Sequence, residues 1–94
     1  MKEIINRVAY DSDRCETLAE RNDYHNGNYT GCRVLMLASD GKVLCMQTTN
    51  GQDLYRDNRM WIPDELELGE LLGKMIASEG QIKRLQELNI IKIA

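Results

Sequence analysis

Residues 32–49 read CRVLMLASDGKVLCMQTT. Two apolar runs without helix breakers flank Asp40-Gly41, and an Asp-Gly pair supplies the positive φ angles of a tight hairpin turn. A second pair of this kind, Asn50-Gly51, follows and leads into a polar segment from Gln52 to about Asn58. The pattern predicts a three-stranded antiparallel meander whose polar third strand lies at the edge of the sheet.

Two-residue turns set the register of this meander. With them, Leu37 lies opposite Leu44, and Met36 lies opposite Cys45 on the other face. Both faces of the central strand are then largely apolar. Because an apolar face must be buried, we expect another element of the structure to cover each face.

An acidic helix follows the meander. Trp61-Ile62-Pro63 ends the strands, and Asp64 fits a helix N-cap with Glu67 as its capping-box partner. Apolar residues recur at helical spacing from there to Leu88. These signals predict helical structure over most of the C-terminal third.

A second start signal interrupts this helical region. Ser78 and Gln81 form another capping box. The pattern therefore permits either two helices broken near residues 78–80 or one long kinked helix. Residues 89–94 are rich in isoleucine and are β-prone, so they are candidates for a short edge strand.

The first third of the chain permits two interpretations. Residues 4–21 carry apolar positions that fit one helix. Alternatively, residues 2–10 form a strand and residues 13–19 form a short capped helix. The second is favoured because residues 11–13, Asp-Ser-Asp, are poor helix interior and good helix start. Residues 21–31 are interpreted as a loop or a frayed hairpin.

Composition is typical of one folded domain. The 94 residues are 43% hydrophobic and 29% charged, which suits a single α+β domain over residues 1–94. We expect a short N-terminal strand and helix, a three-stranded antiparallel meander, and C-terminal helices packed on one of its faces. The net charge is −3 with both signs interspersed, so there is no Lys and Arg surplus to neutralise nucleic-acid phosphates.

The compartment follows from what the sequence lacks. No apolar run is long enough to span a membrane, and the N-terminus has no signal-peptide pattern. The three cysteines are odd in number and widely spaced, which favours reduced thiols over a disulfide framework. We therefore expect a cytoplasmic protein without membrane partners.

Three segments resemble a family of small proteins from phages, prophages and mobile elements. They are residues 10–20, YDSDRCETLAE, the Gly41-Lys42 turn, and residues 62–65, IPDE. The family carries a Tyr-Asp-Thr-x-x-Ala-x-x-Leu/Ile-Ala start, a Gly-centred hairpin and a Pro-led acidic helix. Cys15 stands here where Ala is usual, and the chain has no Phe. The family has no settled activity. Mobile elements also encode small proteins that inhibit host defence, including anti-CRISPR proteins, so the resemblance implies a role of this kind.

No residue pattern points to catalysis or to a metal. The one histidine, His25, would need a carboxylate partner such as Asp23 to act as a general base. The cysteines are Cys15, Cys32 and Cys45. They lack the close Cys-x2-Cys pairs of zinc sites, and no phosphate loop or nucleophile elbow is present. We expect a protein that is not an enzyme and needs no cofactor.

Acidic residues cluster at the start of the first predicted helix, namely Asp64, Glu65, Glu67 and Glu70. Carboxylates at this position suit the positive end of the helix dipole. Charges at the rim of an interface mainly steer association. We expect these four residues to bind a protein partner that carries a basic groove, such as a defence nuclease.

Small residues recur every four positions in the same region, at Gly69, Gly73 and Ala77. Each glycine costs a helix interior about 1 kcal/mol relative to Ala. A small-residue stripe allows close approach of another element, either the molecule's own sheet or a second subunit. Because one helical layer covers only one sheet face, a homodimer built on this stripe or on an uncovered sheet face is a hypothesis.

The leading functional hypothesis is a protein-binding module, an inhibitor of a bacterial defence complex encoded by a mobile element. One alternative is a DNA-associated regulator, since residues 67–89 fit a helix-turn-helix. Its second helix offers only Lys83 and Arg84 against Glu79 and Glu87, which disfavours direct DNA contact. The other alternative is a homo-oligomeric sponge for a nucleotide signal.

Overall fold

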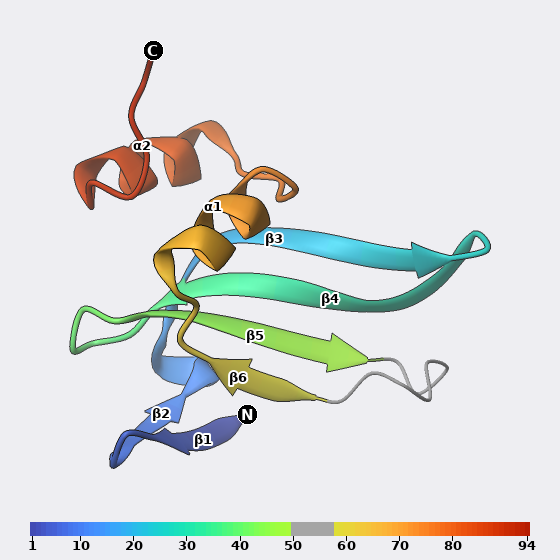
Figure 1. Cartoon of the computed structure of the whole chain (residues 1–94), viewed down its shortest axis with the longest axis horizontal. Helices are drawn as coiled ribbons and strands as arrows, with labels where there is room; N and C mark the ends of the chain where they lie inside the picture. The colour runs from blue at the N-terminus through green and yellow to red at the C-terminus, as the bar shows by residue number, and fades with distance from the viewer. Residues whose placement is uncertain (50–57) are drawn as a thin grey trace.

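Residues 1–49 and 58–94 are described in the computed structural model of the chain. Its centre is an antiparallel sheet with the strand order β3-β4-β5-β6, a hairpin of β1 and β2 lies at one side, and helices α1 and α2 follow β6 (Figure 1). The elements are β1 (Lys2–Ile5), β2 (Val8–Asp11), a 3₁₀ turn (Ser12–Arg14), β3 (Glu16–His25), β4 (Asn28–Leu37), β5 (Val43–Thr49), β6 (Arg59–Trp61), α1 (Glu65–Leu72) and α2 (Glu79–Glu87). This confirms the predicted α+β fold.

The β4–β5 connection is a three-residue loop. The Ala38 N–H donates to the Lys42 carbonyl oxygen at 2.9 Å, and the Gly41 N–H donates to the Ala38 carbonyl oxygen at 3.0 Å. Gly41 has a φ of +87°, the left-handed conformation that ends such a loop. Asp-Gly thus marks the turn as predicted, but the loop is one residue longer than a two-residue turn.

The longer loop shifts the strand register by one residue. Leu35 pairs with Cys45, and Met36 pairs with Leu44. The predictions that Met36 lies opposite Cys45 and that Leu37 lies opposite Leu44 are therefore wrong. The observed pairs decide the faces, because Leu35 and Cys45 pack with the helices while Met36 and Leu44 pack on the opposite side.

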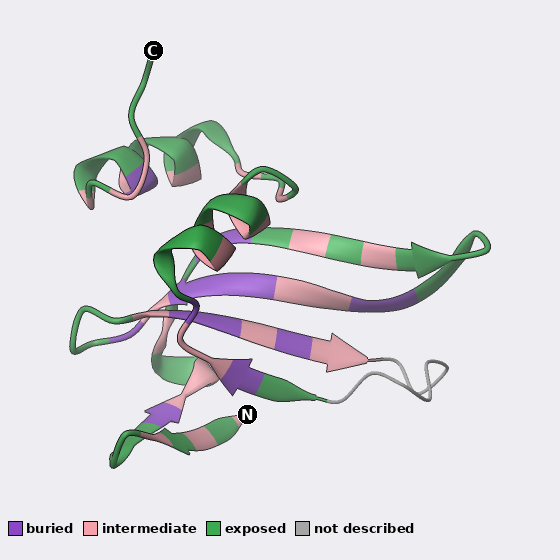
Figure 2. Cartoon of the chain, viewed as in Figure 1, coloured by how far each residue is buried: buried purple, intermediate pink, exposed green. Residues whose placement is uncertain are grey.

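Both faces of the sheet are covered, as expected. On one face Leu18, Leu35 and Cys45 pack with Leu85 of α2, and side chains of α1 join them. On the other face the core consists of Tyr10, Val34, Met36, Ala38, Leu44 and Met60. Tyr10 belongs to the β1–β2 hairpin, so that hairpin supplies the second cover. Figure 2 shows the buried residues concentrated on β4 and β5.

Residues 2–11 form two short strands joined by a turn, and β3 follows from Glu16. The single strand predicted for residues 2–10 and the helix predicted for residues 13–19 are therefore wrong, as is the alternative of one helix over residues 4–21. Ile5 of β1 pairs with Val8 of β2, so Asn6 and Arg7 form a two-residue turn between the strands, and both have the positive φ that such a turn requires. The helical start signals at residues 11–13 produce only the 3₁₀ turn. From Glu16 the chain is extended, because pairing with β4 buries Leu18 and Ala19 around a β-bulge. Long-range pairing here outweighs local helix capping.

Residues 21–31 form the outer part of a long hairpin, one of the two interpretations left open. Asn26 and Gly27 both have positive φ and form a two-residue turn, with His25 opposite Asn28. The sheet therefore begins one strand earlier than the predicted meander. At the other edge, β6 pairs Trp61 with Cys45. The third strand predicted from Gln52 to about Asn58 and its Asn50-Gly51 turn fall almost wholly outside the described residues.

Helix α1 begins where the sequence predicts. The Glu67 N–H donates to Asp64 Oδ1 at 2.8 Å. The Glu67 carboxylate does not close the predicted capping box; its Oε1 accepts the Trp61 indole N–H at 2.9 Å. Because α1 ends at Leu72 and α2 starts at Glu79, the two-helix alternative is correct and the single kinked helix is not.

Helix α2 is hydrogen-bonded at both ends. The Gln81 N–H donates to Ser78 Oγ at 3.2 Å, and the Ser78 N–H donates to Gln81 Oε1 at 2.9 Å, which is the predicted capping box. After the helix, Asn89 has a φ of +58°, and the Ile90 N–H donates to the Leu85 carbonyl oxygen at 3.0 Å. Residues 89–94 therefore form no edge strand, since this ending turns Ile90 back onto the core.

Candidate functional site

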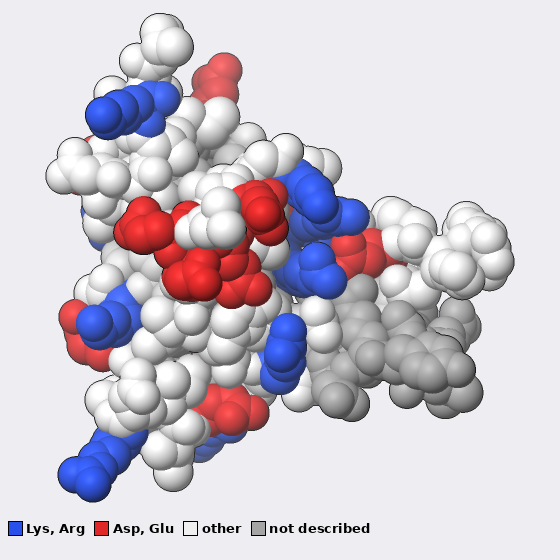
Figure 3. Space-filling view, viewed as in Figure 1, with Lys and Arg blue, Asp and Glu red and all other residues white. Residues whose placement is uncertain are grey.

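The outward side of α1 is acidic and carries one exposed leucine. Asp64, Glu65 and Glu70 are all exposed there, and Leu66 lies among them with 76% of its surface exposed. We call these four residues the acidic face. Figure 3 shows Asp and Glu side chains gathered over the position of α1.

Three of the four predicted partner-binding residues lie on this face, and the fourth does not. Glu67 is half-buried, and its carboxylate holds the indole of Trp61 against the start of α1. Sequence reasoning missed Leu66. The signal was present, because Leu66 is two positions from Leu68 and lies on the opposite side of a helix from the partly buried stripe of Leu68, Leu71 and Leu72.

The small residues predicted to form a dimer interface do not share one helix. Gly69 lies in α1, and a Cβ placed on it meets nothing within 4 Å. Gly73 caps the end of α1, and Ala77 lies in the connection to α2, half-buried against the helix-side core. The predicted stripe is thus interrupted, and the sheet face thought to be uncovered is occupied by the β1–β2 hairpin. The homodimer stays a prediction.

The helix connection instead pairs with the sheet edge. The Ile76 N–H donates to the Glu20 carbonyl oxygen at 2.8 Å, and the Glu20 N–H donates to the Ile76 carbonyl oxygen at 3.2 Å. This bridge satisfies part of the β3 edge. It also explains why the chain leaves the helix after Leu72, since an extended segment is needed to pair with a strand.

A row of cationic side chains crosses the sheet beside α1. Strand pairing places Arg21 opposite Arg33, Arg33 opposite Gln47, and Gln47 opposite Arg59. These residues share the face of the helix-side core, because paired residues lie on one side of a sheet and Leu35 is two positions from Arg33. We call the four residues the arginine row.

Each arginine of this row has a different environment. Arg21 Nε lies 2.9 Å from Asp23 Oδ1, which neutralises it. Arg33 Nε donates to Gln47 Oε1 at 3.2 Å and lies 4.0 Å from Asp23 Oδ2. The Arg59 guanidinium lies over the Trp61 ring, 4.2 Å from its centroid. The positive charge is therefore neutralised at the β3 side of the row.

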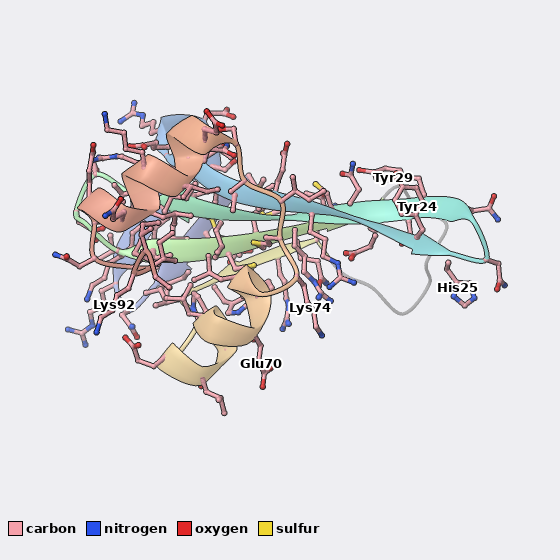
Figure 4. The ribbon with its side chains drawn as sticks, turned by 90° about the horizontal axis from the view of Figure 1, so that it is seen from above. Tyr24, His25, Tyr29, Glu70, Lys74 and Lys92 are labelled. Atoms are coloured by element: carbon pink, nitrogen blue, oxygen red, sulfur yellow. The ribbon has the colours of Figure 1, made fainter. Side chains whose placement is uncertain are left out.

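A pocket of about 160 Å³ lies between the arginine row and α1. Its lining residues are Arg33, Gln47, Arg59, Trp61, Glu67, Glu70, Leu71 and Lys74. Figure 4 shows Glu70 and Lys74 on the α1 side of the sheet, and Figure 3 shows Lys and Arg side chains next to the acidic residues of α1. The pocket thus combines cations from the sheet and from the end of α1 with two carboxylates.

A second polar contact joins the β4–β5 turn to β2. The Tyr10 hydroxyl donates to Asp40 Oδ2 at 2.7 Å, and the Lys42 N–H donates to Asp40 Oδ1 at 3.0 Å. The hydrogen bond from the Lys42 N–H, followed by that from Tyr10, lowers the pKa of Asp40. The hydrogen bond to Asp40 raises the pKa of Tyr10. The arrangement joins the β1–β2 hairpin to the β4–β5 turn, and Tyr10 and Cys15 line one pocket beside it.

The predicted catalytic and metal-binding candidates lie apart from these surfaces. His25 lies exposed at the end of the long hairpin, near Tyr24 and Tyr29, whose ring centroids are 5.9 Å apart (Figure 4). Cys45 is fully buried, and burial raises the pKa of the Cys15 thiol. Within residues 1–49 and 58–94, no three His, Cys, Asp or Glu residues form a group that could hold a metal ion.

Comparisons with known proteins add no constraint on the site. None of the described helices is long and apolar enough to cross a membrane. The resemblance to small phage proteins is left as a prediction. Searches with protein-family models, curated proteins and solved structures find no match to this chain.

Proposed function

We propose that the chain is a protein-binding module whose acidic face docks on a basic surface of another protein. The observation that carries this proposal is Leu66, a large apolar side chain left 76% exposed on a helix start that also exposes the carboxylates of Asp64, Glu65 and Glu70. Its helix has three other leucines packed inward, so nothing in the fold requires a leucine at this position. An apolar anchor with a charged rim is a common arrangement of protein interfaces.

The two kinds of side chain contribute differently to binding. Complete burial of a leucine stabilises a complex by about 1.5–3 kcal/mol, which is roughly a 10- to 150-fold change in affinity. The carboxylates of Asp64, Glu65 and Glu70 mainly accelerate association with a basic partner. Leu66 is therefore the anchor in this proposal, and the carboxylates select the partner by charge.

The proposed partner is a bacterial defence complex with a basic nucleic-acid groove, and the chain acts as its inhibitor. An acidic face presents to such a groove the charge that a phosphate backbone would present. The partner's identity rests on the resemblance to small mobile-element proteins. The proposal uses neither His25 nor Cys45, so it requires no catalytic step, cofactor or metal.

Capture from a bacterial lysate tests the anchor. The immobilised protein should retain a basic partner, and Leu66→Ala should weaken binding of that partner about tenfold or more. Ile4→Ala is the matched control, because Ile4 is 77% exposed and lies on the β1–β2 hairpin. A wild-type protein that retains nothing, or equal losses in the two variants, contradicts the proposal.

Charge reversal tests the rim. Glu65→Lys and Glu79→Lys each place a lysine in the first turn of a helix, so they disturb the two helix dipoles alike. Only Glu65→Lys should slow association with the captured partner, and added salt should weaken the wild-type complex. An interface that is insensitive to salt and to Glu65→Lys would be apolar instead.

A further inference from the structure

We propose that the pocket between the arginine row and α1 binds the phosphate group of a small phosphorylated ligand, held by Arg33, Arg59 and Lys74. This is a second binding activity, different from the protein binding proposed for the acidic face; Glu70 belongs to that face and also lines this pocket. It rests on side chains that are far apart in the sequence and that strand pairing brings to one place.

The sheet spaces the cationic groups suitably for one small ligand. Arg33 and Arg59 are on β4 and β6, separated only by Gln47 on β5. Neighbouring strands lie about 4.8 Å apart, so the two backbones are roughly 10 Å apart and their long side chains can reach a common point between them. Lys74 completes the ring from the connection after α1, and all three line the same pocket.

The cations of this pocket keep donors that the described residues do not use. Arg33 binds Gln47 and faces Asp23 through Nε alone, which leaves its two terminal nitrogens. Arg59 contacts the Trp61 ring and has no carboxylate partner in the described ranges, and the same is true of Lys74. Such donors form their strongest hydrogen bonds with an anion.

The geometry favours phosphate over carboxylate. One arginine satisfies a carboxylate through two parallel hydrogen bonds, and further cations add little. A phosphate monoester has three charged oxygens and about two negative charges at neutral pH. Here the pocket is lined by three cations from β4, β6 and the end of α1, which is more than one carboxylate can use and suits the larger charge of a phosphate.

Two carboxylates line the same pocket and set its affinity. Glu67 is held by the Trp61 indole and closes one wall. Glu70 is exposed and has no cation within ion-pair distance among the residues described, so its charge opposes that of an entering anion. Glu70 is therefore a tuning residue, and its neutralisation should strengthen binding.

Calorimetric titration of the folded protein with inorganic phosphate, adenosine 5′-monophosphate and acetate tests the site. Phosphate and the nucleotide should bind, and acetate should not. Arg59→Gln and Lys74→Gln should each weaken phosphate binding about tenfold. Glu70→Gln should strengthen it about threefold, a change opposite in sign that a loss of folding cannot produce.

Two control variants show whether phosphate binding belongs to this pocket. Arg14→Gln removes an exposed arginine on the other side of the molecule and should leave phosphate binding unchanged. Leu66→Ala should also leave it unchanged, so failure of the acidic-face proposal and failure of this one are distinguishable. Thermal unfolding of each variant confirms that it is folded.

The ligand series also identifies the source of the phosphate. Tighter binding of the nucleotide than of inorganic phosphate indicates a nucleotide ligand, and equal affinities indicate that the phosphate group alone is recognised. Absence of phosphate binding, equal binding of acetate, or binding seen only with a single-stranded oligonucleotide would overturn the proposal. In the last case the arginine row would be part of an extended nucleic-acid surface instead of a pocket.

Discussion

The two ends of the four-stranded sheet differ in how they are covered. At the closed end, which we define by the β4–β5 turn and residues 35–38 and 43–45, helices cover one face and the β1–β2 hairpin covers the other. At the open end, defined by the arginine row and residues 22–31, the strands extend beyond both covers. Figure 2 shows this difference along β3, where buried residues give way to half-buried and exposed ones.

Element lengths explain the difference. The ten residues of β4 span about 33 Å, whereas the eight residues of α1 span about 12 Å. The helices therefore cover the row that contains Leu35 and Cys45, and the next row along the strands is the arginine row. Polar and charged side chains occupy the position where the helices stop: Arg21 and Arg33 are partly exposed, Arg59 is exposed, and Gln47 between them is buried.

The largest expected effect is at the closed end. Leu35→Ala should lower the free energy of unfolding by about 2–5 kcal/mol, because Leu35 is fully buried beneath the helices. Arg59→Ala should lower it by no more than about 1 kcal/mol, the value of a cation–π contact at an exposed site. Urea denaturation monitored by circular dichroism measures both. Comparable losses would show that the open end contributes to stability as the closed end does.

Gly31→Ala probes how tightly β4 and β5 are paired in the open end. Gly31 has a φ of +145°, and an added Cβ would clash with the Thr48 carbonyl oxygen of β5. The backbone strain alone amounts to about 1–3 kcal/mol, and the clash adds to it.

Gly27→Ala is the matched control for this substitution. Gly27 also has positive φ, but its Cβ position is empty, so only conformational strain of about 1–2 kcal/mol applies. Chemical denaturation should show a greater loss for Gly31→Ala. Equal losses would mean that β5 can move away from Gly31, and that the open end is looser than its pairing indicates.

Local signals were sufficient to predict the closed end in outline. Asp64 and Ser78 cap helices through side-chain hydrogen bonds to the backbone a few residues on, and such bonds depend on neighbouring residues alone. The alternation of apolar runs around Asp40-Gly41 predicted the central hairpin for the same reason. The register was wrong because loop length depends on the conformation of Gly41, which the residue type alone does not determine.

Two features that depend on long-range pairing were missed: the strand at residues 16–19 in the closed end and the arginine row in the open end. Residues 16–19 carry a helix-compatible pattern, yet they form a strand because β4 offers a partner. The arginine row was not predicted, since Arg21, Arg33 and Arg59 lie in different segments and only the register of four strands aligns them. The net charge of −3 gave no indication of a cationic cluster, because it sums over the whole chain and carboxylates elsewhere outnumber these three arginines.

The smallest expected effect concerns the hydrogen bond between Tyr10 and Asp40, which holds the β1–β2 hairpin on the closed end of the sheet. Asp40 accepts hydrogen bonds from Tyr10 and from the Lys42 N–H, and its pKa is lowered in the folded state. A lowered pKa means that the folded state favours the carboxylate. The stabilisation that Asp40 gives the fold is therefore complete above the pKa of an unfolded Asp, about 4, and is lost as the pH falls through the lower pKa of Asp40 in the folded state.

Asp40→Asn measures this contribution, because the amide is isosteric and does not titrate. The wild type should be more stable than Asp40→Asn at pH 7, and the difference should shrink below a pH of about 4. Tyr10 should affect stability at the other end of the pH range. Its pKa is raised in the folded state, so the wild type should lose stability relative to Tyr10→Phe as the pH rises above about 10. Chemical denaturation across this pH range tests both limbs. A difference that is constant with pH would show that the hairpin is held on the sheet by the buried apolar contacts of Tyr10 alone, as the helices are held by Leu35 and Leu85.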